Sequence, residues 1–359
     1  AGVNNQSSET AQVLAQNVGS LLEEILSLAN SKFGDRYLFS GSATGGAPFG
    51  RIIQPVAHSA NGFDGSAYTA GTYTGTEDKS YTVRIAASGA FGTAAYEVSD
   101  DGGTTWSPPA TVPASGTVSV GDGLTVRFGD DGVTPLTAGD LFYVNAYTGG
   151  RTTDARIDTP EAAGNNTYAG GTVTQGGTYN GLKNKTYVVK IESGGDLAAA
   201  TYRVSSDGGR NWGAPQNDLD TGTISIGDGI TLSFPAGTFA ANDVFSVQAH
   251  APGVYSGNGE DLSVATGRGS RMTYNVTGEE AFTDRGRGTV DLFATLESLK
   301  TALEKGDREG VNNQVNRLAT AQDNIRQYVA ESGARMSSLN VSKENYQVLD
   351  NKISGLLSE

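Results

Sequence analysis

Residues 311–357 read VNNQVNRLATAQDNIRQYVAESGARMSSLNVSKENYQVLDNKISGLL and carry one hydrophobic register without a slip. Positions spaced alternately by four and three residues run from Val311 to Leu357, and ten of these fourteen positions are apolar. This spacing predicts a helix about 70 Å long with a seam that faces another helix in a left-handed supercoil. The seam residues on which this interpretation depends are Val315, Leu318, Ile325, Val329, Met336, Leu339 and Tyr346. Four seam positions are polar, which indicates either local hydration or contact with a neighbouring subunit: Gln322, Ser332, Lys343 and Asp350.

Two further helices are predicted outside this register. Leucines at helical spacing mark one over residues 292–303, which ends around Gly306. The other covers residues 8–33 and ends near Gly34. Because an apolar seam is stable only when covered, we expect residues 8–33 to pack beside residues 311–357, parallel or antiparallel, in one α-helical domain. The seam of the first helix consists of Leu14, Val18, Leu21, Ile25 and Leu28, with Ala11 at its start.

The composition changes between the ends and the middle of the chain. All ten prolines lie from Pro48 to Pro252, and 43 of the 50 glycines lie in residues 41–290. The middle also carries ten of the fourteen net negative charges. The sequence therefore predicts a mixed α and β protein in which both termini form a long, coiled-coil-like helical rod, and a tandem pair of β-rich modules is inserted between them. The expected domains are residues 1–50 with 252–359, then 51–150, then 151–251.

The middle of the chain is a tandem duplication. YTVRI (81–85) recurs as YVVKI (187–191), and GTVSVGDGLTVRF (116–128) recurs as GTISIGDGITLSF (222–234), both at an offset of 106 residues. Each copy alternates apolar and polar residues around Asp-Gly turns, which predicts short strands and hairpins. Two β-sandwich or small-barrel modules are therefore expected.

Each copy also contains an Asp-box pattern of the kind found in sialidase-like propellers, SDDGGTTW (99–106) and SSDGGRNW (205–212). We interpret both as structural hairpins in which the Asp caps the turn, the glycines take positive φ and the Trp closes the corner against the core. Sugar contact through these loops is the less favoured alternative. The residues that define the two hairpins are Asp101, Gly103, Trp106, Asp207, Gly209 and Trp212.

Several classes of function are disfavoured by the composition. The chain has no Cys, which excludes a disulfide framework, a thiolate nucleophile and a cysteine-based metal site. A formal charge of −14 argues against a nucleic-acid partner, and no apolar run is long enough for a membrane helix. Its two histidines, His58 and His250, are expected at the surface or at a junction, and the acidic turn at residues 130–132 is attributed to turn chemistry rather than to calcium. We therefore predict a protein that is not an enzyme and has no catalytic residue, cofactor or metal. The pair Gly267 and Gly269 has no dinucleotide-fold context.

Three segments, taken in order, resemble the flagellar hook-associated protein 3 family, the hook–filament junction proteins of the flagellin superfamily. RYLFSG (36–41) with Pro48 and Phe49 resembles the motif after the family's first long helix. GVYSGNG (253–259), which leads into YNVTGEEAF (274–282), resembles the β segment before its C-terminal helices, and DLFATL (291–296) resembles the start of these helices. The motif residues are Tyr37, Leu38, Phe39, Gly41, Pro48 and Phe49.

The resemblance implies a structural protein of the bacterial flagellum, located outside the cell, that adapts the hook to the filament. Its partners would be a hook-associated protein below, flagellin above, like subunits in a ring and an export chaperone, with no membrane or nucleic acid. Export would follow the flagellar type III pathway. The family's chains extend further at both ends, so the sequence is expected to be a truncated fragment. Two alternatives stay open: a flagellin-type filament subunit, and a secreted carbohydrate-binding or adhesive surface protein.

Overall fold

The computed structural model describes residues 2–129, 134–180, 184–253, 255–267, 270–286 and 289–357, with side chains from residue 9 onward. The chain is a mixed α and β protein, as the sequence predicts, and it divides into two compact units. Unit 1 contains residues 1–50, 58–60 and 257–359, and unit 2 contains residues 51–57 and 61–256.

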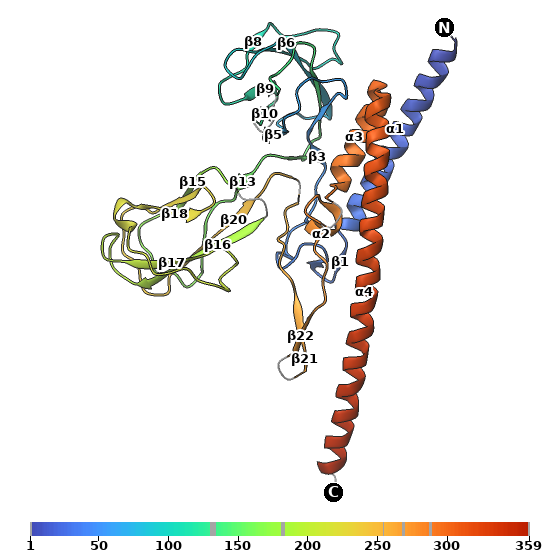
Figure 1. Ribbon diagram of the computed structural model, residues 1–359. Helices are drawn as coiled ribbons and strands as arrows, with labels where there is room; N and C mark the ends of the chain where they lie inside the picture. The colour runs from blue at the N-terminus through green and yellow to red at the C-terminus, as the bar shows by residue number, and fades with distance from the viewer. Residues whose placement is uncertain are drawn as a thin grey trace. The chain divides into compact units, whose positions relative to one another are not determined.

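Unit 1 contains the long helices and draws its elements from both ends of the chain (Figure 1). Two of the helices match the sequence periodicity closely, since the structure has helices at Leu292–Lys305 and Arg308–Leu357. The first helix ends at Ala29, five residues before the predicted end at Gly34, because Gly34 lies in a short hairpin. The elements are α1 (Gly2–Ala29), β1 (Lys32–Phe33), β2 (Arg36–Tyr37), β21 (Ser263–Gly267), β22 (Ser270–Thr273), α2 (Gly278–Phe282), α3 (Leu292–Lys305) and α4 (Arg308–Leu357).

The core of unit 1 lies where α3 packs against both α1 and α4. Leu22 of α1, Leu296 of α3 and Ala321 of α4 belong to one buried cluster. The two terminal helices thus share one helical unit, but their pairing is not the predicted one, because α3 supplies the principal contact surface for each of them. A coiled-coil rod formed by α1 and α4 alone is therefore not the observed packing.

Unit 2 contains the β structure, and its first half comprises two facing sheets and a short parallel pair. The larger sheet has the strand order β4-β11-β6-β7-β8, the smaller one β5-β10-β9, and β12 pairs with β3 in parallel. Alternating side chains of these strands form one buried core. The strands are β3 (Ile52–Ile53), β4 (Pro55–Ala57), β5 (Ala67–Gly71), β6 (Lys79–Ala87), β7 (Ala95–Ser99), β8 (Ala110–Thr111), β9 (Thr117–Gly121), β10 (Leu124–Phe128), β11 (Leu141–Ala146) and β12 (Arg151–Thr152).

The second half of unit 2 repeats this architecture around a separate core. One sheet has the order β13-β20-β16-β17, with β14 also paired to β20, and the other has the order β15-β19-β18. Strands β16 and β6 occupy equivalent places 106 residues apart, as the duplication predicts. The elements are β13 (Arg156–Ile157), β14 (Glu161–Ala162), β15 (Thr174–Gly177), β16 (Lys185–Ser193), β17 (Thr201–Ser205), η1 (Leu219–Thr221), β18 (Thr223–Gly227), β19 (Ile230–Ser233) and β20 (Val244–His250).

Candidate assembly surface

Helix α1 has a wider apolar stripe than its neighbours cover. Ala15, Leu22 and Ala29, which are spaced by seven residues, are its buried side chains, while Val18 and Ile25 are half-buried against the same cluster. At every second position of the predicted seam, the buried side chain is therefore that of the next residue along the helix. The reason is that α3 packs against the neighbouring edge of the apolar stripe. Three predicted seam residues are consequently 45–60% exposed: Leu14, Leu21 and Leu28.

Helix α3 begins at a well-defined cap. The Asp291 side chain accepts a hydrogen bond from the backbone N–H of Ala294 at 2.7 Å, which satisfies one of the free donors of the first turn. Desolvation raises the pKa of the Asp291 carboxyl to about 6, and the nearby Asp284 charge adds to this rise. The cap fixes where α3 starts and thus which of its side chains lie between α1 and α4.

The fully buried residues of helix α4 all lie in its first half. Ala321, Asn324 and Tyr328 are buried, and the predicted seam residues Leu318 and Ile325 are half-buried. Leu339, farther along the helix, is also half-buried. The remaining predicted seam positions are exposed, which corrects their assignment to an internal seam: Val315, Val329, Met336 and Tyr346.

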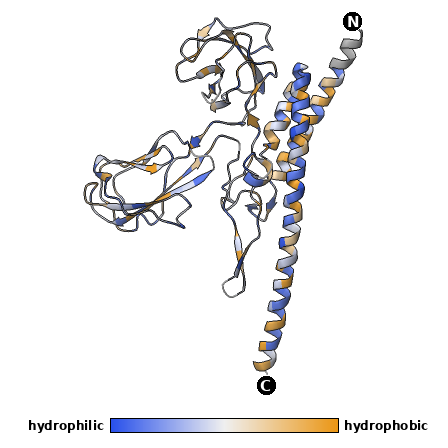
Figure 2. Ribbon diagram, in the orientation of Figure 1, coloured by the Kyte–Doolittle hydropathy of each residue, from blue (hydrophilic) through white to orange (hydrophobic). Residues whose placement is uncertain are grey.

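The second half of α4 carries an apolar line that no described residue covers. All side chains from 343 to 357 are exposed. Apolar residues nevertheless recur to the end of the helix (Figure 2). We call the following set the distal stripe, since its spacing of three, four and three residues places it along one side of the helix: Tyr346, Leu349, Ile353 and Leu356.

An apolar groove of about 470 Å³ opens beside the core of unit 1. Its floor is Leu292 and Leu296 of α3, and its walls come from α1 and α4. The exposed Leu21 of α1 lies in its wall, so the groove continues the uncovered face of that helix. The remaining lining residues are Ile25, Leu318, Ala319, Gln322, Ile325 and Arg326.

The motif segment after α1 and the segment around residue 258 are in direct contact, although 216 residues separate them. The Asn258 Oδ1 accepts from the backbone N–H of Ser42 at 2.8 Å, and the Asn258 N–H donates to the Ser40 carbonyl at 3.1 Å. Gly41, at φ +66°, lies against this asparagine, where a Cβ atom would come within 2.1 Å of the Asn258 carbonyl oxygen. Sequence reasoning did not single out Asn258, and the signal available was its place between two glycines in GNG (257–259).

The aromatic residues of the motif join the core of unit 1. The ring centroid of Phe49 lies 4.8 Å from that of Phe293 and 5.7 Å from that of Phe282. The ring centroid of Phe39 lies 5.1 Å from that of Phe282. Asn30, at the end of α1, exchanges two hydrogen bonds with the Phe49 backbone. The motif thus ties the end of α1 to α2 and α3. Of its other members, Pro48 is buried, Tyr37 is half-buried and Leu38 is exposed.

The two Asp-box turns have the same geometry. Asp101 accepts from the N–H groups of Thr104 and Thr105, both at 2.9 Å, and Asp207 makes the equivalent contacts with Arg210 and Asn211. The hydroxyl of Thr105 also donates to Asp101, and this hydrogen bond, together with the backbone contacts, lowers the pKa of the Asp101 carboxyl to about 2. For Asp207 the backbone N–H of Asn211 is the main cause of the same lowering of the pKa, to about 2. Positive φ angles are found at Gly103 and Gly209, +94° and +90°.

The tryptophans of these turns correct one expectation. Neither Trp106 nor Trp212 belongs to the core cluster of its module. Trp106 is half-buried beneath the Arg84 guanidinium, which lies 4.0 Å from the ring centroid, and Trp212 is 36% exposed. Both rings are therefore surface features, because the Asp–amide contacts close each turn without them.

The described residues contain no group of three or more His, Asp or Glu side chains that could hold a metal ion. His58 accepts from the Ala60 N–H at 3.1 Å. His250 is not at the surface, as its ring is buried and its Nε2 lies 2.9 Å from Asp158. The turn at residues 130–132 and Gly269 lie outside the described residues. In the described part of the chain, no helix has the length and apolar character needed to span a membrane.

Comparison with known proteins returned solved structures only, since no family model and no curated protein matches the chain. FlgL from Xanthomonas campestris is 16% identical, with a TM-score of 0.25 over 93% of this chain and 77% of its own. Flagellar hook-associated protein 3 from Legionella pneumophila is 14% identical, with a TM-score of 0.28 over 98% and 82%. The flagellar hook junction protein FlgK from Burkholderia pseudomallei is 17% identical, with a TM-score of 0.19 over 96% and 60%.

Proposed function

We propose that this chain is a structural subunit of the bacterial flagellum that adapts the hook to the filament at their junction. The single observation that carries the proposal is the uncovered apolar surface of α1 and α4, the exposed leucines of one and the distal stripe of the other. A free helix with leucine and isoleucine at heptad spacing lowers its free energy by packing against another helix. Lateral association of like subunits in a ring would cover these faces.

The motif contacts support the same proposal independently. The segments that resemble the junction family in sequence meet around Asn258 and fasten the end of α1 to α2 and α3. They thereby hold the N-terminal helix and the C-terminal helices in one unit, which is what a subunit that assembles through both termini requires. The two neighbours along the axis would be a hook-associated protein and flagellin, and export would follow the flagellar type III pathway with a chaperone.

The test of the junction role is removal of the gene from its source bacterium. Cells without the protein should build hooks but no filaments, and flagellin should accumulate in the medium, both measured by electron microscopy and by immunoblot. A copy of the gene should restore filaments. Normal filaments in the deletion strain would overturn the proposal. Hooks without filaments and without secreted flagellin would favour the flagellin-type alternative.

The test of the assembly surface introduces single charge substitutions into the restored gene, one in each strain. Leu349→Lys and Ile353→Lys place an ammonium in the distal stripe, so they should abolish filament attachment without changing the thermal unfolding of the protein. Gln347→Lys is the matched control, because two residues along a helix turn it about 200° to the opposite side. Equal motility of all three strains would show that the stripe is not an interface.

A further inference from the structure

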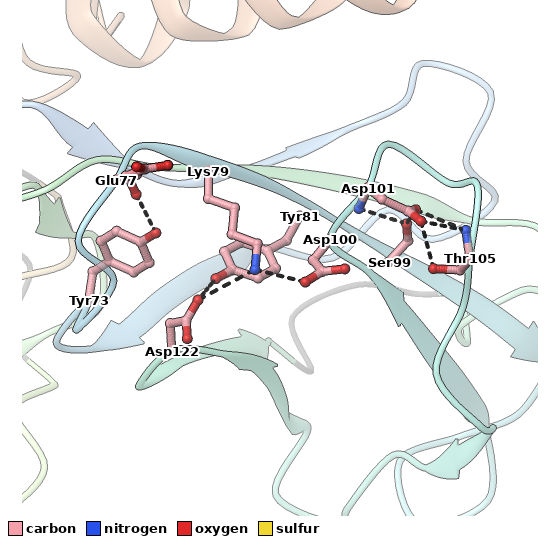
Figure 3. Close-up of polar contacts among 9 residues, drawn as sticks. All are labelled: Tyr73, Glu77, Lys79, Tyr81, Ser99, Asp100, Asp101, Thr105 and Asp122. Carbon is pink, nitrogen blue, oxygen red and sulfur yellow. Dashed lines mark hydrogen bonds and ion pairs between the residues drawn. The ribbon is translucent and has the colours of Figure 1, made fainter.

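At one end of the first β module, two turns surround a hollow of about 360 Å³. One is the Asp-box turn that follows β7, and the other is the tight turn between β9 and β10 (Figure 3). We call this hollow the Lys79 pocket. It is lined by Lys79, Tyr81, Val98, Asp100, Thr105, Trp106, Ser107, Val120, Gly121 and Asp122.

The polar groups of the Lys79 pocket include charges of both signs. The Lys79 ammonium lies 2.7 Å from Asp100 Oδ2 and 3.7 Å from Asp122 Oδ2, so it bridges the two turns. The hydroxyl of Tyr81 donates to the same Asp122 carboxylate. Between about two fifths and three fifths of each charged side chain remains in contact with solvent. These donors and acceptors are therefore accessible to a ligand.

An aromatic surface adjoins these polar groups. Trp106 lines the pocket, and the Arg84 guanidinium lies over its ring at 4.0 Å. Arg84 is itself paired with Glu97 and is not among the pocket-lining residues, so it holds the indole in place without filling the hollow. Since Trp106 lies outside the module's core, core packing does not account for a tryptophan here.

Comparison of the two modules distinguishes the pocket residues that both contain, which the shared fold can explain, from those that only the first module contains. The second module repeats the tryptophan as Trp212. It also repeats the lysine, the tyrosine and the turn aspartate: Lys185 lies 2.6 Å from Asp228, and Tyr187 donates to Asp228. This shared trio is explained by its role in tying the turn to the sheet. Asp100 has no such explanation, because the equivalent residue of the second module is Ser206.

We propose that the Lys79 pocket binds a neutral carbohydrate, with Trp106 facing the sugar ring and Asp100, Asp122 and Lys79 bonding its hydroxyls. A pyranose presents an apolar C–H face and a rim of hydroxyls that both donate and accept, which matches an aromatic side chain beside carboxylates and an ammonium. Two carboxylates against one ammonium leave a net negative site, which disfavours uronic and sialic acids. This site is independent of the proposed junction role, which rests on unit 1 alone.

The test uses the two tryptophans of the chain as reporters. In a Trp212→Phe background, Trp106 is the sole indole, and its fluorescence is followed during titration with glucose, galactose and N-acetylglucosamine. At least one sugar should shift the emission, with half-saturation at roughly millimolar concentration. Asp100→Ser should weaken this binding at least tenfold. This change introduces the residue that the second module carries at the equivalent place, so the fold should tolerate it, and thermal unfolding checks that it does.

Glu161→Ser is the matched control, since it removes an exposed carboxylate from the second module and should leave the titration unchanged. Glucuronic acid should bind at least tenfold more weakly than glucose, because the site repels a carboxylate. The proposal is overturned by the absence of a response to all three neutral sugars, by equal binding to the folded Asp100→Ser protein, or by glucuronic acid binding as tightly as glucose. Binding of a cationic ligand such as choline in place of any neutral sugar would also overturn it.

Discussion

Gly41 shows how one residue without a side chain joins two distant segments of the chain. Its positive φ and its close approach to the Asn258 backbone leave no room for a Cβ atom, and the same asparagine accepts the N–H of the next residue. The contact between residues 40–42 and 258 therefore depends on glycine at this position.

We expect Gly41→Ala to lower the free energy of unfolding of unit 1 by about 2–4 kcal/mol, since a strained backbone and a steric clash add to each other. Gly34→Ala is the matched control, because Gly34 has a similar φ of +60° but open space around its Cβ position. It should cost only about 1 kcal/mol. Chemical denaturation followed by helix circular dichroism measures both, and an equal loss for the two variants would contradict the steric explanation.

The carboxyl of Asp291 gives unit 1 a specific dependence on pH. Its pKa is raised from 3.8 to about 6 in the folded protein, so between these values the native state binds more protons than the unfolded state. Stability from this group therefore rises as the pH falls from about 7 to about 4. Asp291→Asn keeps the helix cap but removes the titration.

We expect Asp291→Asn to be more stable than the wild type at pH 7.5, by on the order of 2 kcal/mol, and to lose this advantage progressively towards pH 4. Denaturant unfolding at four or five pH values measures the difference between the two proteins. Because other titrating groups are common to both, they cancel in the difference. A gap that is constant with pH would mean that burial does not perturb this carboxyl.

At the level of the elements, the periodicity predicted where helices lie better than which sides they bury. The positions of α3 and α4 follow from the apolar periodicity, and the strands at residues 81–85 and 116–128, with their copies 106 residues later, follow from alternation and from the duplication. Which residues of α1 are buried could not be derived in this way. The apolar stripe of this helix is wide enough for either of two neighbouring sets of residues to be buried, and the position of α3 determines which set it is. The Lys79 pocket could not be predicted from the sequence either, since Lys79 and Asp122 are 43 residues apart and meet only when two strands pack. The recurrence of both residues in the second module was the available signal.

Because α3 packs against both α1 and α4, shortening one of its buried side chains should lower the free energy of unfolding more than a similar change in α4. Leu296 is only 1% exposed, so Leu296→Ala should cost about 2–5 kcal/mol through lost burial and a cavity. Leu318 of α4 is half-buried beside an open groove, and Leu318→Ala should cost about 1 kcal/mol because water can fill the space. Thermal or denaturant unfolding of both variants measures this order. The reverse order would show that α4, rather than α3, is the central helix of unit 1.

At the level of the whole molecule, each unit has a core made from its own residues. The buried cluster of the long helices includes no residue between 61 and 256, and the two β clusters include none from α1, α3 or α4. Residues 58–60 belong to unit 1, where Ser59 donates to the Asp307 carboxylate at 2.6 Å ahead of α4. The β region that is inserted into unit 1 therefore comprises residues 51–57 and 61–256, and the chain returns briefly to unit 1 at residues 58–60.

Replacement of residues 51–57 and of residues 61–256 by flexible Gly/Ser linkers should leave the helices of unit 1 folded, with a cooperative thermal transition. Circular dichroism at 222 nm measures helix content per molecule, and the exchange rates of amides in α3 report its burial. As a control, the excised β region, residues 51–256, is expressed alone and should give a β-rich spectrum. Loss of the helical transition in the linker variant would refute the independence of unit 1.

The separation of α1 from α3 by more than 260 residues has a consequence for the time course of folding. Contacts within each β module span at most about a hundred residues, whereas Leu22 finds its partners only after the chain through α3 and α4 is available. Loop closure over such a distance is slow compared with local hairpin formation. Pulse-labelling hydrogen exchange during refolding should therefore show protection first in β6 and β16 and last in α1, whose apolar face stays open longest to any binding partner that acts before folding is complete.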